Sequence, residues 1–366
     1  MTAREGAPLA PYAMSTLPAM SALAPPPTLP LYATTLAQMT GVLHSRTRAL
    51  SALRALHAAT PVARVPDVLP GVSRAVWHEA RARFHVPAWR VARRHAAGDG
   101  TTKYAIAFGG AGDDQAVETV WIPGRARETV CVSSQVGCTR ACTFCATAEI
   151  GFRRNLTADE IVLQYLLAAH DARALPRNVV FMGMGEPMDN LDHVLAAIGV
   201  LTGAPTPLLG ADHITVSTSG IGPGMERFLR ESDVGFALSL NGTTDEQRAR
   251  IMPQTLRWPL AELFGIMRAD AALRPRRRYF MEYVMLAGVN DGDADADRLP
   301  ALLAGLRAHV NLIPHNAFPG NALTASAPDM VARFRDRLHA HGVRAFVRAP
   351  RGQDIAAACG QLARRG

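Results

Sequence analysis

Between residues 130 and 314 the sequence alternates between apolar runs typical of buried strands and longer stretches with helical periodicity. One helical stretch opens with the capping-box pattern Thr157-x-x-Glu160. Successive parallel strands need crossover helices, so this alternation predicts an α/β fold with a parallel sheet, closed or partly closed as a barrel. The six expected strands are 130–134, 178–182, 213–217, 235–240, 279–285 and 310–314.

The rest of the chain divides by composition into segments on either side of this core. Residues 1–35 are rich in Pro and Ala and are expected to be a disordered tail. Residues 36–97 are interpreted as a basic helical module, broken near its prolines. Residues 98–123 predict a β-hairpin around a Gly-rich turn, 124–348 the barrel core, and 349–366 a carboxyl-terminal segment.

Three cysteines follow the first expected strand, with the spacing Cys138-x3-Cys142-x2-Cys145. Three thiolates can hold three corners of a [4Fe–4S] cluster and leave one iron open to a small molecule. The alternatives are three buried free thiols or a structural zinc site, although zinc usually takes four ligands from paired Cys-x2-Cys units. Because active-site residues of such folds gather at the carboxyl ends of the strands, the cysteines lie where a site is expected.

Other strand ends also carry small polar groups. Gly185 and Glu186 follow the second strand, where glycine admits close backbone approach and the carboxylate can accept from an ammonium group. Each such stretch alone is more often a simple strand-to-helix turn. Together they predict recognition of a nucleoside amino acid by residues that also include Ser217, Ser239, Leu240, Asn241 and Asn316.

The charge of the chain is unevenly placed. The formal net charge is +8, and residues 41–95 contain ten arginines against only Asp67 and Glu79. A basic module beside a neutral body is typical of a phosphate-backbone grip, which predicts a nucleic-acid partner. The alternative is a solvated Arg/Ala-rich surface, in a chain whose only lysine is Lys103.

Composition also bears on the compartment. Five cysteines, three of them clustered, argue against a secreted disulfide framework. No run approaches the roughly 18 apolar residues of a membrane span. We therefore expect a protein of the reducing cytosol, without a membrane partner.

Several motifs together resemble the RlmN/Cfr family of radical S-adenosylmethionine (SAM) adenosine methyltransferases. The matching runs begin at Cys131 and end at Leu362, and two extra cysteines, Cys131 and Cys359, distinguish them from ordinary radical SAM enzymes. These runs are Cys131-Val-Ser-Ser-Gln-Val-Gly-Cys138, Gly151-Phe-x-Arg-Asn155-Leu, Met182-Gly-Met-Gly-Glu-Pro187, Asn311-Leu-Ile-Pro314 and Asp354-Ile-Ala-Ala-Ala-Cys-Gly-Gln-Leu362.

The resemblance implies a partial (βα)6 barrel and a specific set of roles. Cys138, Cys142 and Cys145 would hold the [4Fe–4S] cluster, and two SAM molecules would be used per turnover. One SAM would methylate Cys359, and the second would be cleaved to a radical that takes a hydrogen from this S-methyl group. The resulting methylene radical would add to an adenine carbon of RNA. Cys131 would then release the product through a transient disulfide with Cys359, and Glu118 would take the ring proton.

The family also implies partners, and the chain departs from the family at a few places. The expected substrate is 23S ribosomal RNA and, in the RlmN branch, also transfer RNA, with C2 of adenine favoured and C8 or another RNA as alternatives. A flavodoxin or ferredoxin would supply electrons to a monomeric enzyme. Asn241 replaces the usual histidine of a Ser-Leu-His motif, and His315 and Ala317 flank Asn316 where an aromatic residue and a proline are common.

Overall fold

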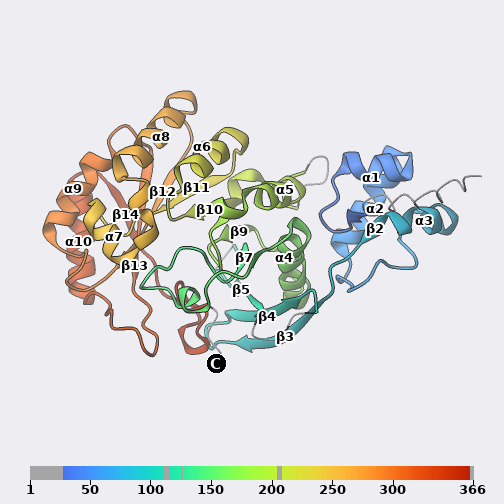
Figure 1. Ribbon diagram of the computed structural model, residues 1–366, viewed down its shortest axis with the longest axis horizontal. Coiled ribbons are helices and arrows are strands. Elements are labelled where there is room, and N and C mark those ends of the chain that lie inside the picture. The colour runs from blue at the N-terminus through green and yellow to red at the C-terminus, as the bar shows by residue number, and fades with distance from the viewer. Residues whose placement is uncertain (1–27, 111, 113–114, 125–126, 204–207, 363–366) are drawn as a thin grey trace, which may run out of the picture.

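The computed structural model describes residues 28–110, 112, 115–124, 127–203 and 208–362. It has a strand–helix body and a smaller helical module at the amino-terminal end (Figure 1). The two parts share one continuous set of packed apolar side chains. Residues 1–27 of the expected tail lie outside the described residues.

A ten-stranded sheet organises the body, in the order β14-β13-β12-β11-β10-β9-β6-β5-β4-β3. Neighbours from β6 to β14 in this order pair in parallel, which confirms the predicted parallel sheet. All six expected strands are present, and β14 adds a seventh parallel strand that was not predicted. The parallel strands are β6 (Thr129–Cys131), β9 (Asn178–Phe181), β10 (Ile214–Thr218), β11 (Gly235–Ser239), β12 (Tyr279–Met285), β13 (Ala308–Pro314) and β14 (Arg344–Val347).

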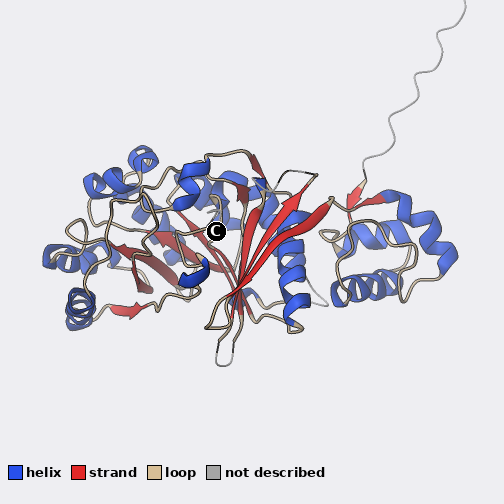
Figure 2. Ribbon diagram, turned by 90° about the horizontal axis from the view of Figure 1, so that it is seen from below, coloured by secondary structure: helices blue, strands red, loops and turns tan. Residues whose placement is uncertain are grey.

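Helices cover the outer side of this curved sheet (Figure 2). The first begins where the sequence predicts, because the Thr157 hydroxyl accepts from the Glu160 N–H and the Glu160 carboxylate accepts from the Thr157 N–H. Crossover helices on one side leave the carboxyl ends of the strands to form an open mouth. The helices are α4 (Ala158–Ala172), α5 (Leu191–Leu201), α6 (Gly222–Glu231), α7 (Asp245–Ile251), α8 (Leu260–Leu273), α9 (Asp293–Leu303) and α10 (Pro328–Ala340).

Three antiparallel strands extend the sheet: β3 (Trp89–Ala96), β4 (Thr102–Phe108) and β5 (Val117–Ile122). The pairing of β4 with β5 confirms the expected hairpin. The expectation that 36–97 is entirely helical is wrong at β3, where pairing with β4 overrides the helix-favouring Arg and Ala content. Because β3 is the last strand of the sheet, its arginines also charge the exposed edge.

The amino-terminal module contains α1 (Leu36–Leu43), α2 (Arg46–Ala58) and α3 (Arg74–Ala80). The predicted disorder of 28–35 is also wrong. β1 (Leu29–Pro30) pairs with β2 (Phe84–His85), and the side chains that follow are buried. The Ala33 N–H donates to the Asp159 carboxylate of α4 at 2.7 Å, which fastens the module to the body.

Within the described residues, no helix has the length and apolar character needed to cross a membrane.

Candidate active site

The cysteine triplet lies on a loop that starts after β7 (Gln135–Val136), and β7 pairs with β8 (Arg154–Asn155) to close the base of this loop. Gly137 has φ +74°, and a Cβ atom there would lie 1.6 Å from the Gly151 carbonyl oxygen. Only glycine therefore fits this crossing. The crossing fixes the loop over the mouth of the sheet.

Cys138, Cys142 and Cys145 all line one cavity at this mouth, which we call the cysteine cavity. Burial raises the pKa of each thiol, to about 12 for Cys138. Among the described residues, no three metal-binding side chains stand close enough to hold a single ion. A cubane cluster needs a different arrangement, because each thiolate binds a different iron.

The residues of the cysteine cavity fit such a cluster in their chemistry. Bound iron would supply the positive charge that keeps buried cysteines ionised, which burial alone opposes. Three thiols are available, and the same cavity contains Glu186, Ser217 and Ser239 for a ligand at the open iron.

Glu186 bridges two strand ends of the cavity. Its carboxylate accepts from the N–H groups of Met188 at 3.0 Å and Ser219 at 2.8 Å. The carboxylate also lines the cavity, where a ligand ammonium would donate to it. Burial raises the pKa of Glu186, and the N–H donors oppose this. Gly185, at φ +104°, is required because a Cβ atom would lie 2.7 Å from the Gln135 backbone nitrogen.

The other expected contacts divide into two groups. Ser217 and Ser239 line the cavity with their hydroxyl oxygens 3.2 Å apart. The Leu240 side chain is fully buried and does not line the cavity. Asn241 lines it, but its Oδ1 already accepts from the Val284 N–H at 2.8 Å. Asn241 also has φ +53°, a conformation that asparagine tolerates better than most residues.

Asn316 connects the cavity to the carboxyl-terminal segment. Its Nδ2 donates to the Cys359 carbonyl at 3.0 Å, and its Oδ1 accepts from Gln353 at 2.8 Å. Cys359 is accessible to solvent and lines the cysteine cavity. The surrounding protein and the negative charge of Glu282 nevertheless raise the pKa of its thiol, while Arg348 lowers it. Asn316 thus holds the backbone that presents Cys359.

A second cavity, of about 660 Å³, adjoins the first and is called the lateral cavity. Cys131, at the end of β6, lines it together with Cys359. Arg348, Arg351 and the half-exposed Phe346 also line it. Burial raises the pKa of Cys131, and the charge of Cys359 adds to this effect. All five cysteines are free thiols, so the structure contains no Cys131–Cys359 disulfide.

Glu118 lies apart from both cavities. It is buried on β5 and forms an ion pair with Lys103, with Nζ and Oε1 3.0 Å apart. Lys103 also donates to the Ala356 carbonyl at 3.1 Å. Glu118 lines a neighbouring hollow of about 430 Å³ on the same carboxyl-terminal segment. The structure therefore brings Glu118 close to this segment but not into a cavity with Cys359.

Comparisons of this chain with known proteins all indicate the same family. The model of the Radical SAM superfamily matches residues 132–298. The dual-specificity RNA methyltransferase RlmN of Anaeromyxobacter dehalogenans is 49% identical over 262 residues, which cover 69% of this chain and 70% of that protein. The RlmN of Halorhodospira halophila is 43% identical over 297 residues, covering 81% and 82%. This chain belongs to the RlmN family.

A solved structure supports the same assignment. A radical SAM methyltransferase from Sphaerobacter thermophilus has 38% sequence identity and a TM-score of 0.81, over 92% of this chain and 99% of that chain. The radical SAM fold and the methyltransferase class expected from the sequence are confirmed. The RlmN family also implies a [4Fe–4S] cluster and SAM as cofactors, in agreement with the fit of the cysteine cavity.

Three residues of the cysteine cavity were not singled out as site residues. Arg140 belongs to the cysteine loop and forms an ion pair with Asp189 at 2.7 Å. The spacing of the cysteines does not reveal this contact, because Asp189 is distant in the sequence. His315 was noted only as a departure from the family pattern, yet it is buried and lines the cavity. Glu282 lines both cavities, and a glutamate inside an otherwise apolar strand was a signal that could have identified it.

Proposed function

We propose that this RlmN-family protein methylates a ring carbon of adenine in RNA through an S-methylated Cys359. The main support is the position of Cys359 at the junction of two cavities, one with the cysteine triplet and one with Cys131. A methyl carrier must first face the methyl donor and then the acceptor base. Cys359 lines both spaces without a change of fold.

The cysteine cavity is the proposed site of cluster and SAM. Cys138, Cys142 and Cys145 would hold the [4Fe–4S] cluster, which supplies the electron that cleaves SAM when both are bound. Glu186 would accept from the amino group of SAM, and Ser217 and Ser239 would hydrogen-bond its polar groups. Leu240 would contribute through the backbone of its strand end, and Asn241 and Asn316 mainly through positioning.

Cys359 and Cys131 take the two covalent roles. The Cys359 sulfur, having lost its thiol proton, would attack the methyl carbon of one SAM, and S-adenosylhomocysteine would leave. After a hydrogen is removed from this S-methyl group by use of a second SAM, its carbon would bond to adenine and link RNA to the protein. After loss of the ring proton, the Cys131 thiolate would attack the Cys359 sulfur as the carbon–sulfur bond breaks. The released carbon would take up a proton to become the methyl group, and one electron would pass back to the oxidised iron–sulfur cluster, which leaves a transient disulfide. Two SAM molecules are consumed per methylation.

Glu118 is the proposed acceptor of the adenine ring proton. It is a buried carboxylate whose Oε1 lies 3.0 Å from Lys103 Nζ, so its position is fixed by this contact. Lys103 also contacts the segment that carries Cys359, through the Ala356 carbonyl. Movement of this segment when RNA binds would be needed to bring the adduct within reach of Glu118, since the two now line different hollows.

The lateral cavity is the proposed site for the target adenine. Its volume of about 660 Å³ falls within the range of small-ligand sites. Phe346 offers an aromatic surface for a base, and Arg348 and Arg351 offer positive charge for the flanking phosphates. Direct access to both Cys131 and Cys359 supports this placement.

The named relatives are dual-specificity RNA methyltransferases. We infer that the substrates here are 23S ribosomal RNA and transfer RNA, with C2 of adenine preferred over C8. The exposed arginines of the amino-terminal module would grip the phosphate backbone. We further propose that the enzyme is a cytosolic monomer reduced by a flavodoxin or ferredoxin.

The test is incubation of the reduced protein, purified without oxygen, with labelled SAM and either ribosomal or transfer RNA. Nucleoside mass spectrometry should find the label in 2-methyladenosine. Label in 8-methyladenosine would assign the alternative carbon. Label only in another base, or in no RNA, would refute the proposed function.

A further inference from the structure

A cavity of about 580 Å³ lies at the end of the barrel opposite to the cysteines. Residues at the amino ends of the strands line it, among them Asn178 at the start of β9, Gly235 at the start of β11, and Arg278 just before β12. The carboxyl ends of the same strands lead to the cysteine cavity. None of the site residues discussed above lines this opposite cavity.

Six arginines line this space, which we call the arginine basin, against two aspartates, Asp212 and Asp233. Four of the arginines come from the short connection between α8 and β12. Such a concentration of one charge in a hollow raises the local potential, because low-dielectric walls focus the field. The arginines are Arg127, Arg274, Arg276, Arg277, Arg278 and Arg307.

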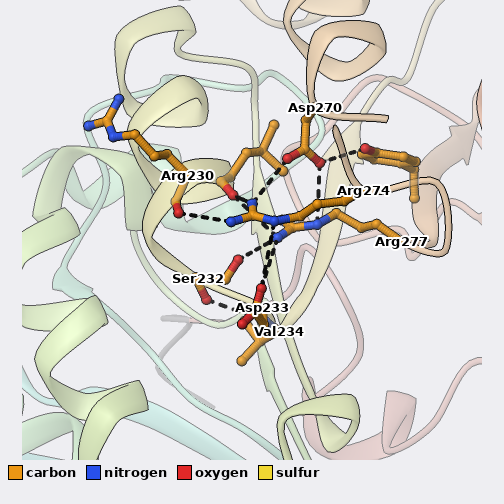
Figure 3. Close-up of polar contacts among 9 residues, drawn as sticks. Arg230, Ser232, Asp233, Val234, Asp270, Arg274 and Arg277 are labelled. Atoms are coloured by element: carbon orange, nitrogen blue, oxygen red, sulfur yellow. Dashed lines mark hydrogen bonds and ion pairs between the residues drawn. The ribbon is translucent and has the colours of Figure 1, made fainter. Parts of the chain in front are cut away.

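Two of these arginines form a fixed wall (Figure 3). Arg274 and Arg277 pair with the buried Asp270, at 3.1 and 3.3 Å. Both also donate to the Leu229 carbonyl in the last turn of α6, and Arg274 donates to the Arg230 carbonyl at 3.0 Å. The Arg277 side chain is only 6% exposed, and its Nη1 has no hydrogen-bond partner among the described residues.

The other four arginines have no ion-pair partner in the part of the chain that the structure describes. Arg307 donates only to the Arg276 carbonyl, at 3.3 Å. The charge of the basin also affects His309. Burial is the main cause that lowers the pKa of His309, and the positive charges of Arg344, Arg278 and Arg307 lower it further. Asp233 is 83% exposed and 3.7 to 3.8 Å from Arg277 and Arg274, so it compensates little of this charge.

The chemistry of the basin suits phosphate. Guanidinium groups present planar pairs of N–H donors that match phosphate oxygens, and a buried N–H without a partner gains one when an anion binds. The amino-terminal module contacts α4 at both ends, because the Ala33 N–H donates to Asp159 in the first turn and the Thr60 hydroxyl lies 2.8 Å from His170 Nε2 in the last turn. Arg94 of β3 pairs with Asp171 in the last turn of α4 at 2.9 Å, and β9 follows α4 in the chain.

We propose that the arginine basin is a second phosphate-binding site, which holds backbone phosphates of the RNA substrate at the end of the barrel opposite to the cysteine triplet. The inference rests on the proposed function for its RNA. It adds a contact surface at the end of the barrel that bears no catalytic group. RNA held by the amino-terminal module would reach the basin past the last turn of α4, which the module contacts through Thr60 and His170.

The test compares RNA binding by wild type and by the triple variant Arg276→Ala, Arg278→Ala and Arg307→Ala over a range of salt concentrations. Loss of three phosphate contacts should make the slope of log affinity against log salt shallower by about 2 to 3 units. Cleavage of SAM without RNA should be unchanged. A matched control removes the same charge from the outer helix α10, with Arg333, Arg335 and Arg337 each changed to Ala, and should leave the slope near wild type.

A second variant, Arg276→Glu with Arg278→Glu, should weaken RNA binding more than the triple alanine variant, with an unchanged circular dichroism spectrum. Calorimetry with inorganic pyrophosphate tests whether the basin also binds a small phosphate ligand in the absence of RNA. An RNA salt slope unaltered in both basin variants would overturn the proposal, whether or not pyrophosphate binds. If wild type neither binds nor methylates RNA, the proposed function fails instead, which is a distinguishable outcome.

Discussion

The two ends of the barrel differ in how their polar groups are used. At the mouth, Glu186 accepts two backbone N–H groups and Asn316 holds the Cys359 backbone, so each side chain has a defined partner. At the opposite end, four arginines face a hollow without an ion pair among the described residues. The first arrangement fixes positions, whereas the second collects charge.

The fixed contacts at the mouth and the arginines collected at the opposite end suit different functions. Covalent chemistry needs atoms held within fractions of an ångström, and fixed strand ends provide this. Phosphate binding depends on the number of positive charges and tolerates displacement of any one. Substitutions at the mouth should therefore act in an all-or-none manner, and substitutions at basic surfaces should act in small equal steps.

The largest effect is expected from the cysteine triplet. Cys138→Ala, Cys142→Ala and Cys145→Ala should each lose the iron–sulfur cluster and all cleavage of SAM, because two thiolates hold a cubane poorly. Iron and sulfide analysis together with 5′-deoxyadenosine production measures this. A variant that keeps normal iron content and normal SAM cleavage would contradict the assignment of the three cysteines as cluster ligands.

Cys359 and Cys131 should separate two stages of one reaction. Cys359→Ala should abolish RNA methylation, since no carrier remains. Cys131→Ala should accumulate a covalent protein–RNA adduct, because addition proceeds and release fails. Denaturing gel electrophoresis with labelled RNA detects this adduct, and its absence from an otherwise active Cys131→Ala enzyme would contradict the release role.

Glu118→Gln should lower the methylation rate by about 10²- to 10⁴-fold, the usual contribution of a positioned base. The adduct should again accumulate, because proton loss follows addition. Glu262→Gln, on the exposed side of α8, serves as the control. An unchanged rate in Glu118→Gln would exclude this carboxylate from proton transfer.

The pH dependence of Cys359 methylation gives a smaller effect. The pKa of this thiol is raised, and only the thiolate is nucleophilic. Below that pKa, methylation of Cys359 without RNA should speed up about tenfold for each unit rise in pH. Peptide mass spectrometry follows the S-methyl group, and a rate that falls with pH would oppose this assignment.

The smallest effect is expected from single arginines of the amino-terminal module. Arg48→Ala should reduce the salt slope of RNA binding by about 0.7 to 0.9 unit and leave the saturated rate unchanged. Arg335→Ala on α10 provides a control of equal charge. A large loss of rate at saturating RNA would show that this surface does more than hold phosphate.

The sequence predicted most of the mouth because its residues follow strand ends. Periodicity locates the strands, and parallel strands bring Cys138, Glu186, Ser217 and Ser239 to one edge. The sequence could not show that the side-chain oxygen of Asn241 already accepts a hydrogen bond from the Val284 N–H and so has less capacity to bind a ligand. Such a partner lies 43 residues away and depends on tertiary packing.

The amino-terminal region was predicted less well for a related reason. β3 consists mainly of arginine, alanine and histidine, with few residues that favour strands. It forms because β4 offers a free edge, which local propensity does not report. The arginine basin was also not foreseen, since its arginines come from three separate connections and only the run 274–278 is visible in the sequence.

The most direct test of the central claim counts hydrogen isotopes in the product. RNA is methylated with SAM that carries a CD3 methyl group, and the methylated adenosine is analysed by mass spectrometry. If Cys359 carries the methyl group and loses one hydrogen before the new carbon–carbon bond forms, the product methyl group contains two deuterium atoms. A product that retains all three would mean direct transfer from SAM and would contradict the account.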